Sequence, residues 1–376
     1  MSHRLSYPGL LFALLLGLTC AGCQPNRSSE DGTEPTAEKK LSEDDQSAID
    51  VVPIAAQVEK AAVSVRRDEN DKIIEVSFRG SSVGDVAGQL SLLPKLRSVL
   101  LSGSNADDAT MAEIGKITTL ENLDLRGCAI SDAGLSALSK LPRLKAIKLS
   151  RRDGQTKVTA EGASALGQIK SLKVIALDFL PIGDAGVRSL SELPELRELY
   201  LAGTSLTDQS AETLAGFDQL TKLRLASNDL SGETIRQLVS VQGIAELDIS
   251  DCPKIDSASI TELAGFSELA KLNLYATGVG EGDWESLAKL NKLQWLNVDK
   301  TDVNDAALDG IGKLESLTFL HLGSTKITDA GMPRLANLKH LRKLIVTRTA
   351  VTQAGVDGLQ DSLPTTEIQL EYVEGK

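Results

Sequence analysis

Eleven segments of the chain repeat one pattern of apolar and polar positions. Each segment reads L-x-x-L-x-L, with isoleucine, valine or another apolar residue sometimes replacing a leucine, and the segments begin 24 residues apart except for one step of 28 and one of 25. Their first residues are Leu96, Leu120, Leu144, Leu172, Leu196, Leu220, Ile244, Leu269, Leu293, Leu317 and Leu341. A recurring period of this length predicts a solenoid in which each repeat forms one structural unit.

Each repeat contains the periodicities of one strand and one short helix. The L-x-L alternation is typical of a strand, whereas the later G-L-x-x-L part places its apolar residues on one helix face. Between them lies a run such as Ser131-Asp132-Ala133-Gly134-Leu135, in which the serine is expected to cap the helix and the glycine to relieve crowding. No repeat can bury its leucines alone, so the repeats must stack with a parallel sheet on the concave face and helices on the convex face.

The repeated T-D-A-G-L run, as at Thr328 to Met332, resembles the short bacterial form of the leucine-rich repeat family. The resemblance covers the chain from about residue 72 to its C-terminus, with the repeats over 72–365. It implies an α/β leucine-rich-repeat solenoid, or horseshoe, that binds another macromolecule and is not an enzyme. Function on such a scaffold depends on surface residues, so the resemblance does not identify the partner.

Both ends of the repeat stack need a cap, because an end layer exposes a strand edge and an apolar core. We expect an N-terminal cap over 47–71, formed by an amphipathic helix over 47–60 and by Val63–Arg66 pairing with Ile73–Phe78. At the other end, residues 366–376 are expected to form a cap strand and a polar tail, since Thr366 to Leu370 is in register with the preceding strand positions.

The N-terminus indicates secretion. Residues 1–22 have a positive start, a short apolar run and small residues before Cys23, as in a signal peptide. The ending Cys20-Ala21-Gly22-Cys23 resembles a bacterial lipobox and implies lipid attachment at Cys23, although Cys20 stands where leucine is usual and leaves ordinary secretion as an alternative. Residues 23–46 are polar and predict a disordered tether. The expected location is extracytoplasmic and lipid-anchored, with Gln24 favouring an outer membrane.

Charge and composition narrow the possible partners. The formal net charge is -12 and the acidic residues are spread along the chain, which argues against nucleic acid because phosphate contacts need clustered cations. With three histidines and no phosphate-binding or dinucleotide motif, we expect no metal site and no cofactor. Cys128 and Cys252 lie five layers apart, too far for a disulfide, and are interpreted as buried core residues.

One short motif suggests catalysis. Gly80-Ser81-Ser82-Val83-Gly84 matches the G-x-S-x-G nucleophile elbow and follows a predicted strand. However, His321 and His340 lie about ten repeats away along the stack, so neither could act as the base. A hydrolase with its nucleophile at Ser82 is therefore the least favoured hypothesis.

The residues between the strand leucines must face the concave side and are the candidates for binding. We place Tyr275, Trp295 and Phe319 on exposed positions of three successive strands, with His321 beside them. Tyr200 and Arg224 form a smaller candidate cluster. Aromatic residues and arginine dominate binding interfaces, so the sequence predicts a membrane-tethered scaffold that binds a protein.

Two further features are open to more than one interpretation. The 28-residue step adds four residues at a strand exit and carries Arg151, Arg152 and Lys157, which could form a second contact loop or a neutral insertion. Stacked aromatics together with Asn273 and Asn297 would also suit a carbohydrate or peptidoglycan, so a glycan-binding envelope protein is the alternative. The threonines that recur after the strands are expected to be structural, bonding backbone groups there; they are Thr204, Thr277, Thr301, Thr325 and Thr349.

Overall fold

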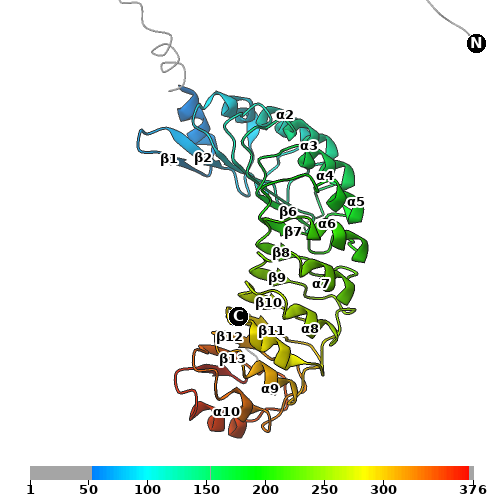
Figure 1. The fold of residues 1–376 in the computed structure, drawn as a ribbon. Coiled ribbons are helices and arrows are strands. Elements are labelled where there is room, and N and C mark those ends of the chain that lie inside the picture. Colours follow the sequence, from blue (N-terminus) through cyan, green and yellow to red (C-terminus); the bar gives the residue numbers. More distant parts are fainter. Residues whose placement is uncertain (1–52, 153, 372–376) are drawn as a thin grey trace, which may run out of the picture. The chain divides into compact units, whose positions relative to one another are not determined.

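The computed structural model describes residues 53–152 and 154–371, which belong to a single compact unit, Ser47–Lys376. Figure 1 shows this unit as one continuous stack of strands and short helices. The predicted signal peptide, the lipid attachment at Cys23 and the tether over 23–46 lie outside the described residues.

The strands form one open sheet of 14 strands, in which spatial order follows sequence order. The first pair is antiparallel and every later pair is parallel. The strands are β1 (Ser64–Arg67), β2 (Ile73–Ser77), β3 (Ser98–Leu100), β4 (Asn122–Asp124), β5 (Ala146–Ser150), β6 (Val174–Asp178), β7 (Glu198–Tyr200), β8 (Lys222–Arg224), β9 (Glu246–Asp248), β10 (Lys271–Asn273), β11 (Trp295–Asn297), β12 (Phe319–His321), β13 (Lys343–Ile345) and β14 (Glu367–Gln369). The predicted parallel sheet is confirmed.

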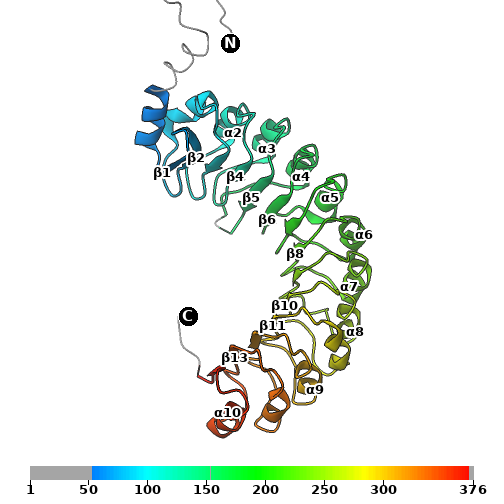
Figure 2. The same cartoon turned by 60° about the vertical axis from the view of Figure 1, so that its left-hand side comes forward.

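Short helices cover the outer side of the stack, and Figure 2 shows them on the convex side with the strands inside the curve. The α-helices are α2 (Asp108–Ile114), α3 (Asp132–Leu138), α4 (Ala160–Gly167), α5 (Gly183–Arg188), α6 (Ala211–Ala215), α7 (Gly232–Leu238), α8 (Ser259–Leu263), α9 (Ala307–Ile311) and α10 (Gln353–Gln360). The 3-10 helices are η1 (Gly84–Leu92), η2 (Asp208–Ser210), η3 (Trp284–Lys289) and η4 (Met332–Leu335). The fold is therefore the predicted leucine-rich-repeat solenoid.

Aspartates link many of the repeats to the next along the convex side. Asp132 accepts hydrogen bonds from the backbone N–H of Thr159 (2.8 Å) and from its hydroxyl (2.7 Å). Thr159 in turn caps α4 by accepting from the N–H of Glu161, as the sequence predicts for this position. The same aspartate pairing joins Asp108 to Ser131, Asp184 to Thr207, Asp208 to Ser231, Asp305 to Thr328 and Asp329 to Thr352. We call this set the aspartate ladder.

The ladder also explains the glycine of the repeat. A β-carbon at Gly134 would collide with the carboxylate of Asp108 from the preceding repeat. The glycine is needed because the neighbouring aspartate approaches so closely, and not only because the chain turns there.

The core is a continuous apolar column between the sheet and the helices, formed by the strand leucines and the apolar faces of the helices. Cys128 and Cys252 are buried free thiols within it, as predicted. The recurring threonines are structural, as expected: Thr204 Oγ1 donates to the carbonyl of Leu201 (2.7 Å), and the other four bond in the same way.

Most strands are followed by a residue in the left-handed backbone region. Glycine occupies this position after several N-terminal strands, for example Gly103 (φ +69°) and Gly127 (φ +73°). After β6 the residue is Phe179, with φ +63°. A bulky side chain in this region costs about 1–3 kcal/mol unless the surroundings hold it there. Phe179 is the one aromatic residue among the described residues with this conformation.

A helix over residues 53–61 and the β1–β2 hairpin lie at the start of the stack. Val58 of this helix is fully buried against the same core that contains Ile73 and Val76. At the other end, β14 pairs in parallel with β13. Both ends of the apolar column are therefore covered by chain within the described residues.

Candidate functional site

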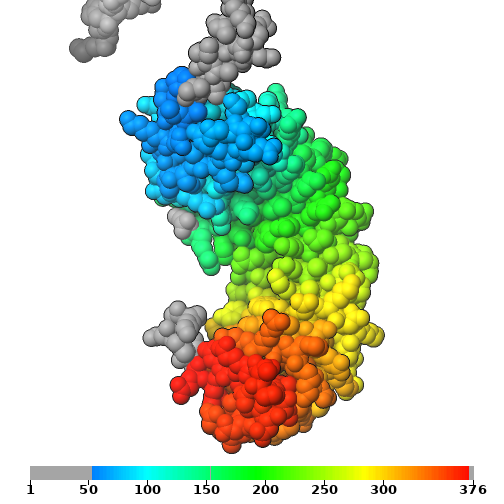
Figure 3. Space-filling view, turned by 90° about the vertical axis from the view of Figure 1, so that its left-hand side faces the viewer, coloured from blue at the N-terminus to red at the C-terminus, as the bar shows by residue number. Residues whose placement is uncertain are grey.

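The strand register fixes which side chains share a column on the concave face. Lys271, Trp295 and Phe319 form one column across β10, β11 and β12. Asn273, Asn297 and His321 form the next. Figure 3 views the molecule from the strand side, where the middle repeats are set back between the two ends of the stack.

The aromatic rings of Trp295 and Phe319 stack on each other. Their centroids are 5.1 Å apart with an interplanar angle of 5°, and the His321 ring meets Phe319 edge-on at 6.4 Å. Burial lowers the pKa of His321, and this effect outweighs the opposing charge of Asp299, whose Oδ2 lies 3.9 Å from His321 Nε2. The imidazole is thus held in its neutral form beside the stack.

Tyr275 does not belong to this group, which corrects its expected strand position. It lies two residues beyond the end of β10, whose residue next to Trp295 is Lys271. The Tyr275 ring contacts Lys300, whose Nζ is 4.9 Å from the ring centroid. The L-x-x-L-x-L pattern does not show where pairing stops, because the three-residue strand ends before the last leucine.

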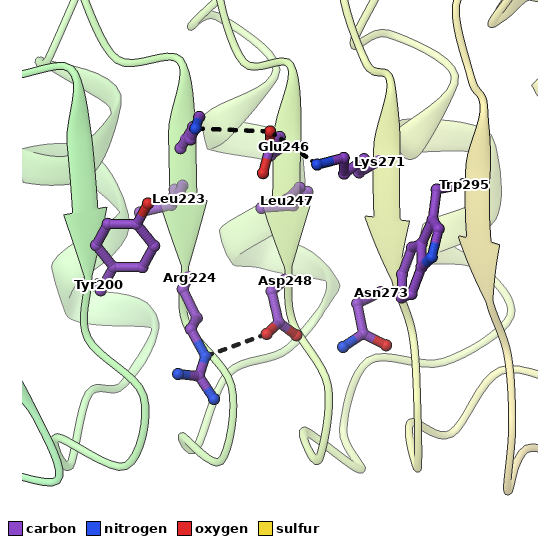
Figure 4. A pocket seen from close by; sticks show the side chains of 10 residues that line it. Tyr200, Leu223, Arg224, Glu246, Leu247, Asp248, Lys271, Asn273 and Trp295 are labelled. Atoms are coloured by element: carbon purple, nitrogen blue, oxygen red, sulfur yellow. Dashed lines mark hydrogen bonds and ion pairs between the residues drawn. The ribbon is translucent and has the colours of Figure 1, made fainter. Parts of the chain in front are cut away.

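The structure instead joins Trp295 to Tyr200 and Arg224 around a shallow hollow of about 430 Å³. Tyr200 on β7 and Trp295 on β11 stand on opposite sides, four strand spacings or about 19 Å apart. Figure 4 shows the two rings facing the space above β8, β9 and β10. We call this space the Tyr200–Trp295 hollow. The sequence named these residues in two separate clusters because they lie four repeats apart.

Two rows of charged residues cross the floor of the hollow. In one, Glu246 lies between Lys222 (3.7 Å) and Lys271 (3.2 Å). In the other, Arg224 bridges Asp178 and Asp248, each at 3.2 Å. Sequence reasoning selected only Arg224 from these rows, although the alternation of charges along the two columns was visible. The opposite charges in each row neutralise one another, so the aromatic side chains of Tyr200 and Trp295 are the main surface of the hollow on which a partner could pack.

Asparagines continue the second column, with Asn273 lining the hollow and Asn297 lying one strand further. The side-chain oxygens of Asn273 and Asn297 accept from the backbone N–H of Tyr275 (3.2 Å) and Asp299 (2.9 Å) respectively. No hydrogen bond from either side-chain amide nitrogen is found within the described residues, so both remain available as donors. The surface next to Trp295 can therefore donate hydrogen bonds to a partner.

The inserted loop does not bring its three cations together. Arg152 stacks on the Phe179 ring, with its guanidinium carbon 5.3 Å from the centroid, and Arg151 begins the loop directly after β5. Lys157 lies at the other end of the loop, where its backbone bridges to Ser131. Phe179 was missed from the sequence because it lies beyond the leucine positions of its strand and its partner, Arg152, belongs to the preceding repeat.

The Ser82 motif has no catalytic geometry in the described part of the chain. Ser82 is exposed after β2, whereas His321 is on β12, ten strands or about 48 Å along the sheet. Burial raises the pKa of both thiols, to about 11 for Cys252, so neither is a reactive nucleophile. Within residues 53–152 and 154–371, no three histidine, cysteine, aspartate or glutamate side chains are grouped to hold a metal ion.

No helix of the described region combines the length and the apolar character needed to cross a bilayer.

Comparison with known proteins agrees with the observed repeat. Residues 116–139 and 313–336 match the family model described as Leucine Rich repeat. Each stretch runs from the end of one outer helix through a strand to the next outer helix, so each covers one structural unit. A search of curated proteins found no match.

Two solved structures show the same type of fold. An internalin (inlF) from Listeria monocytogenes is 19% identical, with coverage of 86% of this chain and 94% of the internalin and a TM-score of 0.61. A TDR receptor is 16% identical with a TM-score of 0.51; the match covers 76% of this chain and 52%, or about half, of the receptor. Identities this low show likeness of fold alone. The chain thus has the fold of a leucine-rich-repeat solenoid, and two of its repeats match the Leucine Rich repeat model.

Proposed function

We propose that the chain is a protein-binding scaffold, held outside the cytoplasm by a lipid on Cys23. The contact surface extends from the Tyr200–Trp295 hollow to Phe319 and His321. The observation that carries this proposal is the hollow itself, in which two aromatic walls flank a floor of satisfied ion pairs. Tyrosine, tryptophan and arginine are the residues most enriched among interface hot spots.

A protein partner suits this surface better than a glycan. A sugar ring stacks on an open aromatic face, whereas one face of Trp295 is covered by Phe319. Tyr200 is held through its hydroxyl, which donates to Glu198 Oε2 at 2.8 Å. The surface therefore offers rigid ring edges and walls into which side chains of a partner can fit, with little conformational entropy lost on binding.

The contact surface can be tested with two matched aromatic variants, Trp295→Ala and Tyr275→Ala. Both remove one half-buried ring from the C-terminal half of the concave side, but only Trp295 lines the hollow. After chemical cross-linking in cells that carry the protein, we expect Trp295→Ala to recover at least about tenfold less partner and Tyr275→Ala to recover as much as wild type.

Both variants must first show the melting behaviour of the wild type. Equal recovery with both variants would refute the contact surface. Recovery of cell-wall glycan in place of a protein, lost in Trp295→Ala, would instead support the glycan alternative.

Membrane attachment rests on the lipobox resemblance of residues 20–23, which precede a polar stretch over 24–46. The test is Cys23→Ser with metabolic labelling by a fatty acid. We expect the wild type to carry the label and to sediment with membranes, and the variant to lose both properties. An unlabelled wild type would contradict lipidation and favour ordinary secretion.

A further inference from the structure

A second surface lies on the N-terminal side of the Tyr200–Trp295 hollow, where β4, β5 and β6 end. Arg79, Arg126 and Lys148 line a separate hollow of about 310 Å³ on the concave face. Arg151 and Arg152 follow directly after β5, at the start of the inserted loop. We call these five cations the basic strand-exit surface. It occurs in a chain whose formal net charge is -12.

The positive charge of this surface is only partly neutralised. Arg79 and Arg126 share one carboxylate, Asp124, at 3.5 Å and 2.7 Å. Burial raises the pKa of Asp124, but the hydrogen bond and charge of Arg126 outweigh burial and lower it, so the carboxylate is ionised. Lys148 and Arg151 form no ion pair within the described residues, and both are exposed. Over residues 53–152 and 154–371, the cations therefore outnumber the acids paired with them.

The other nearby carboxylates are already engaged elsewhere. Asp178 accepts from the backbone N–H of Ala202 (2.8 Å) and from Arg224 (3.2 Å). Glu198 accepts from the Tyr200 hydroxyl and lies 3.5 Å from Lys222. Among the described residues, Asp178 therefore neutralises the surface only in part, through its charge on Arg126, because its oxygens already accept from Ala202 and Arg224.

The side chain that contacts Arg152 supports a role for this surface in binding. Phe179 follows β6 in the left-handed position (φ +63°) that Gly127, Gly203 and several later non-glycine residues occupy after their own strands. Its ring lies so close to Gly203 that a β-carbon there would collide with it. The other contact of the ring is the guanidinium of Arg152. The left-handed conformation recurs along the solenoid; what is particular to this repeat is the large ring, which supports an exposed arginine.

A guanidinium stacked on a ring keeps its N–H donors free in its own plane, which suits bidentate binding of a carboxylate. We propose that the basic strand-exit surface binds an acidic segment of a protein partner, with aspartate or glutamate side chains contacting Lys148, Arg151 and Arg152. A nucleic acid fits less well, because the surrounding acidic chain repels a long polyanion. The surface is separate from the Tyr200–Trp295 hollow, so either can fail without the other.

The test uses a fluorescein-labelled twelve-residue peptide of alternating glutamate and glycine, with the matching glutamine peptide as its control. Binding is measured by fluorescence anisotropy at low salt. The triple variant Lys148→Gln, Arg151→Gln, Arg152→Gln is compared with Lys95→Gln, Lys140→Gln, Lys289→Gln. Both variants lose three positive charges at exposed positions, but only the first alters the proposed surface.

We expect the wild type to bind the glutamate peptide and not the glutamine peptide. The Kd should rise at least about tenfold in the first triple variant and less than about twofold in the second. Equal effects of the two variants would overturn the proposal, since general charge would then explain binding. Tighter binding of a thymidine oligonucleotide, or of vesicles containing an anionic phospholipid, would also overturn it.

Phe179→Gly provides a second readout, because glycine accepts the left-handed conformation without strain. We expect its melting temperature to equal or exceed that of the wild type, while the Kd for the glutamate peptide rises about threefold or more. An unchanged Kd would show that the ring does not position Arg152 for binding.

Discussion

Single side chains in this solenoid either stabilise the fold or are available to contact a partner, and their position within the repeat decides which. The hydroxyls of Thr204 and the equivalent threonines donate hydrogen bonds to backbone carbonyls where the strands end, so they stabilise the fold. Trp295 and His321, one strand apart, project instead from the concave sheet. The sequence predicted both groups correctly as to face, because period-2 alternation determines orientation. It could not predict the stacking of rings, which depends on side-chain rotamers.

His321 gives a prediction for pH dependence. Its pKa is lowered in the folded chain by burial, so the unfolded chain binds a proton more readily. The contribution of His321 to the free energy of unfolding is therefore complete above the unfolded pKa, about 6.5, and is lost as the pH falls from there towards the lower folded pKa. We expect His321→Gln to lose less stability than wild type between pH 7.5 and 5.5.

Urea unfolding at several pH values measures this difference. His340→Gln is the control, since His340 is exposed after η4. A pH dependence that is the same in wild type and His321→Gln would contradict the assignment.

At the scale of single elements, the aspartate ladder determines how one repeat attaches to the next. Sequence reasoning identified the Ser or Thr cap but not the aspartate, because the aspartate bonds the following repeat and not its own helix. Its recurrence in register was the available signal. Two repeats show what the aspartate contributes. Asp208 also accepts a hydrogen bond from the hydroxyl of Thr234. In the next repeat Gly232 stands in the aspartate position, and the buried Ser259 hydroxyl has no partner among the described residues.

This pair of hydroxyls predicts opposite effects for two small substitutions. Thr234→Val removes a hydroxyl that donates to a carboxylate, so we expect the free energy of unfolding to fall by about 1–3 kcal/mol. Ser259→Ala removes a buried hydroxyl with no partner, so we expect no loss of stability or a gain of up to about 1 kcal/mol. Urea denaturation of the two variants beside wild type measures both values. Similar destabilisation by both would contradict the ladder interpretation.

Across the whole solenoid, the sequence predicted the number and order of the repeats but not how distant repeats cooperate. The Tyr200–Trp295 hollow depends on two rings that are four repeats apart, and on how the intervening strands curve. The 24-residue period contains no information about that curvature. Phe179 escaped prediction for a related reason, because the arginine that its ring contacts belongs to the preceding repeat.

The uneven aspartate ladder predicts uneven local stability. In the described part of the chain, aspartate ladder bonds join the repeats up to Ser231, except between α4 and α5, and again after Asp305. Over residues 232–304 the aspartate is replaced by Gly232, Ser257 and Glu281, and only one hydrogen bond each, from Gly280 to Ser257 and from Asn304 to Glu281, links the repeats at this position. The outer elements there are also short, with α8 spanning five residues and η3 forming a 3-10 helix. We expect amides of α8 and η3 to exchange with solvent faster than those of α3 and α4, because local opening requires fewer contacts to break.

Hydrogen exchange followed by mass spectrometry resolves these segments. Slower exchange in α8 and η3 than in α3 and α4 would show that the ladder does not control local opening.

Because each repeat contributes one strand, the width of the hollow depends on the number of repeats between its two walls. Tyr200 and Trp295 are separated by the strands β8, β9 and β10, so inserting or deleting one repeat between them would move the two walls by a single step of about 4.8 Å. The chemistry of each wall would stay the same, as would the cations at the ends of β4 and β5. A solenoid of this kind can therefore be refitted to a longer or shorter partner by duplication of a repeat, without redesign of the surfaces that make contact.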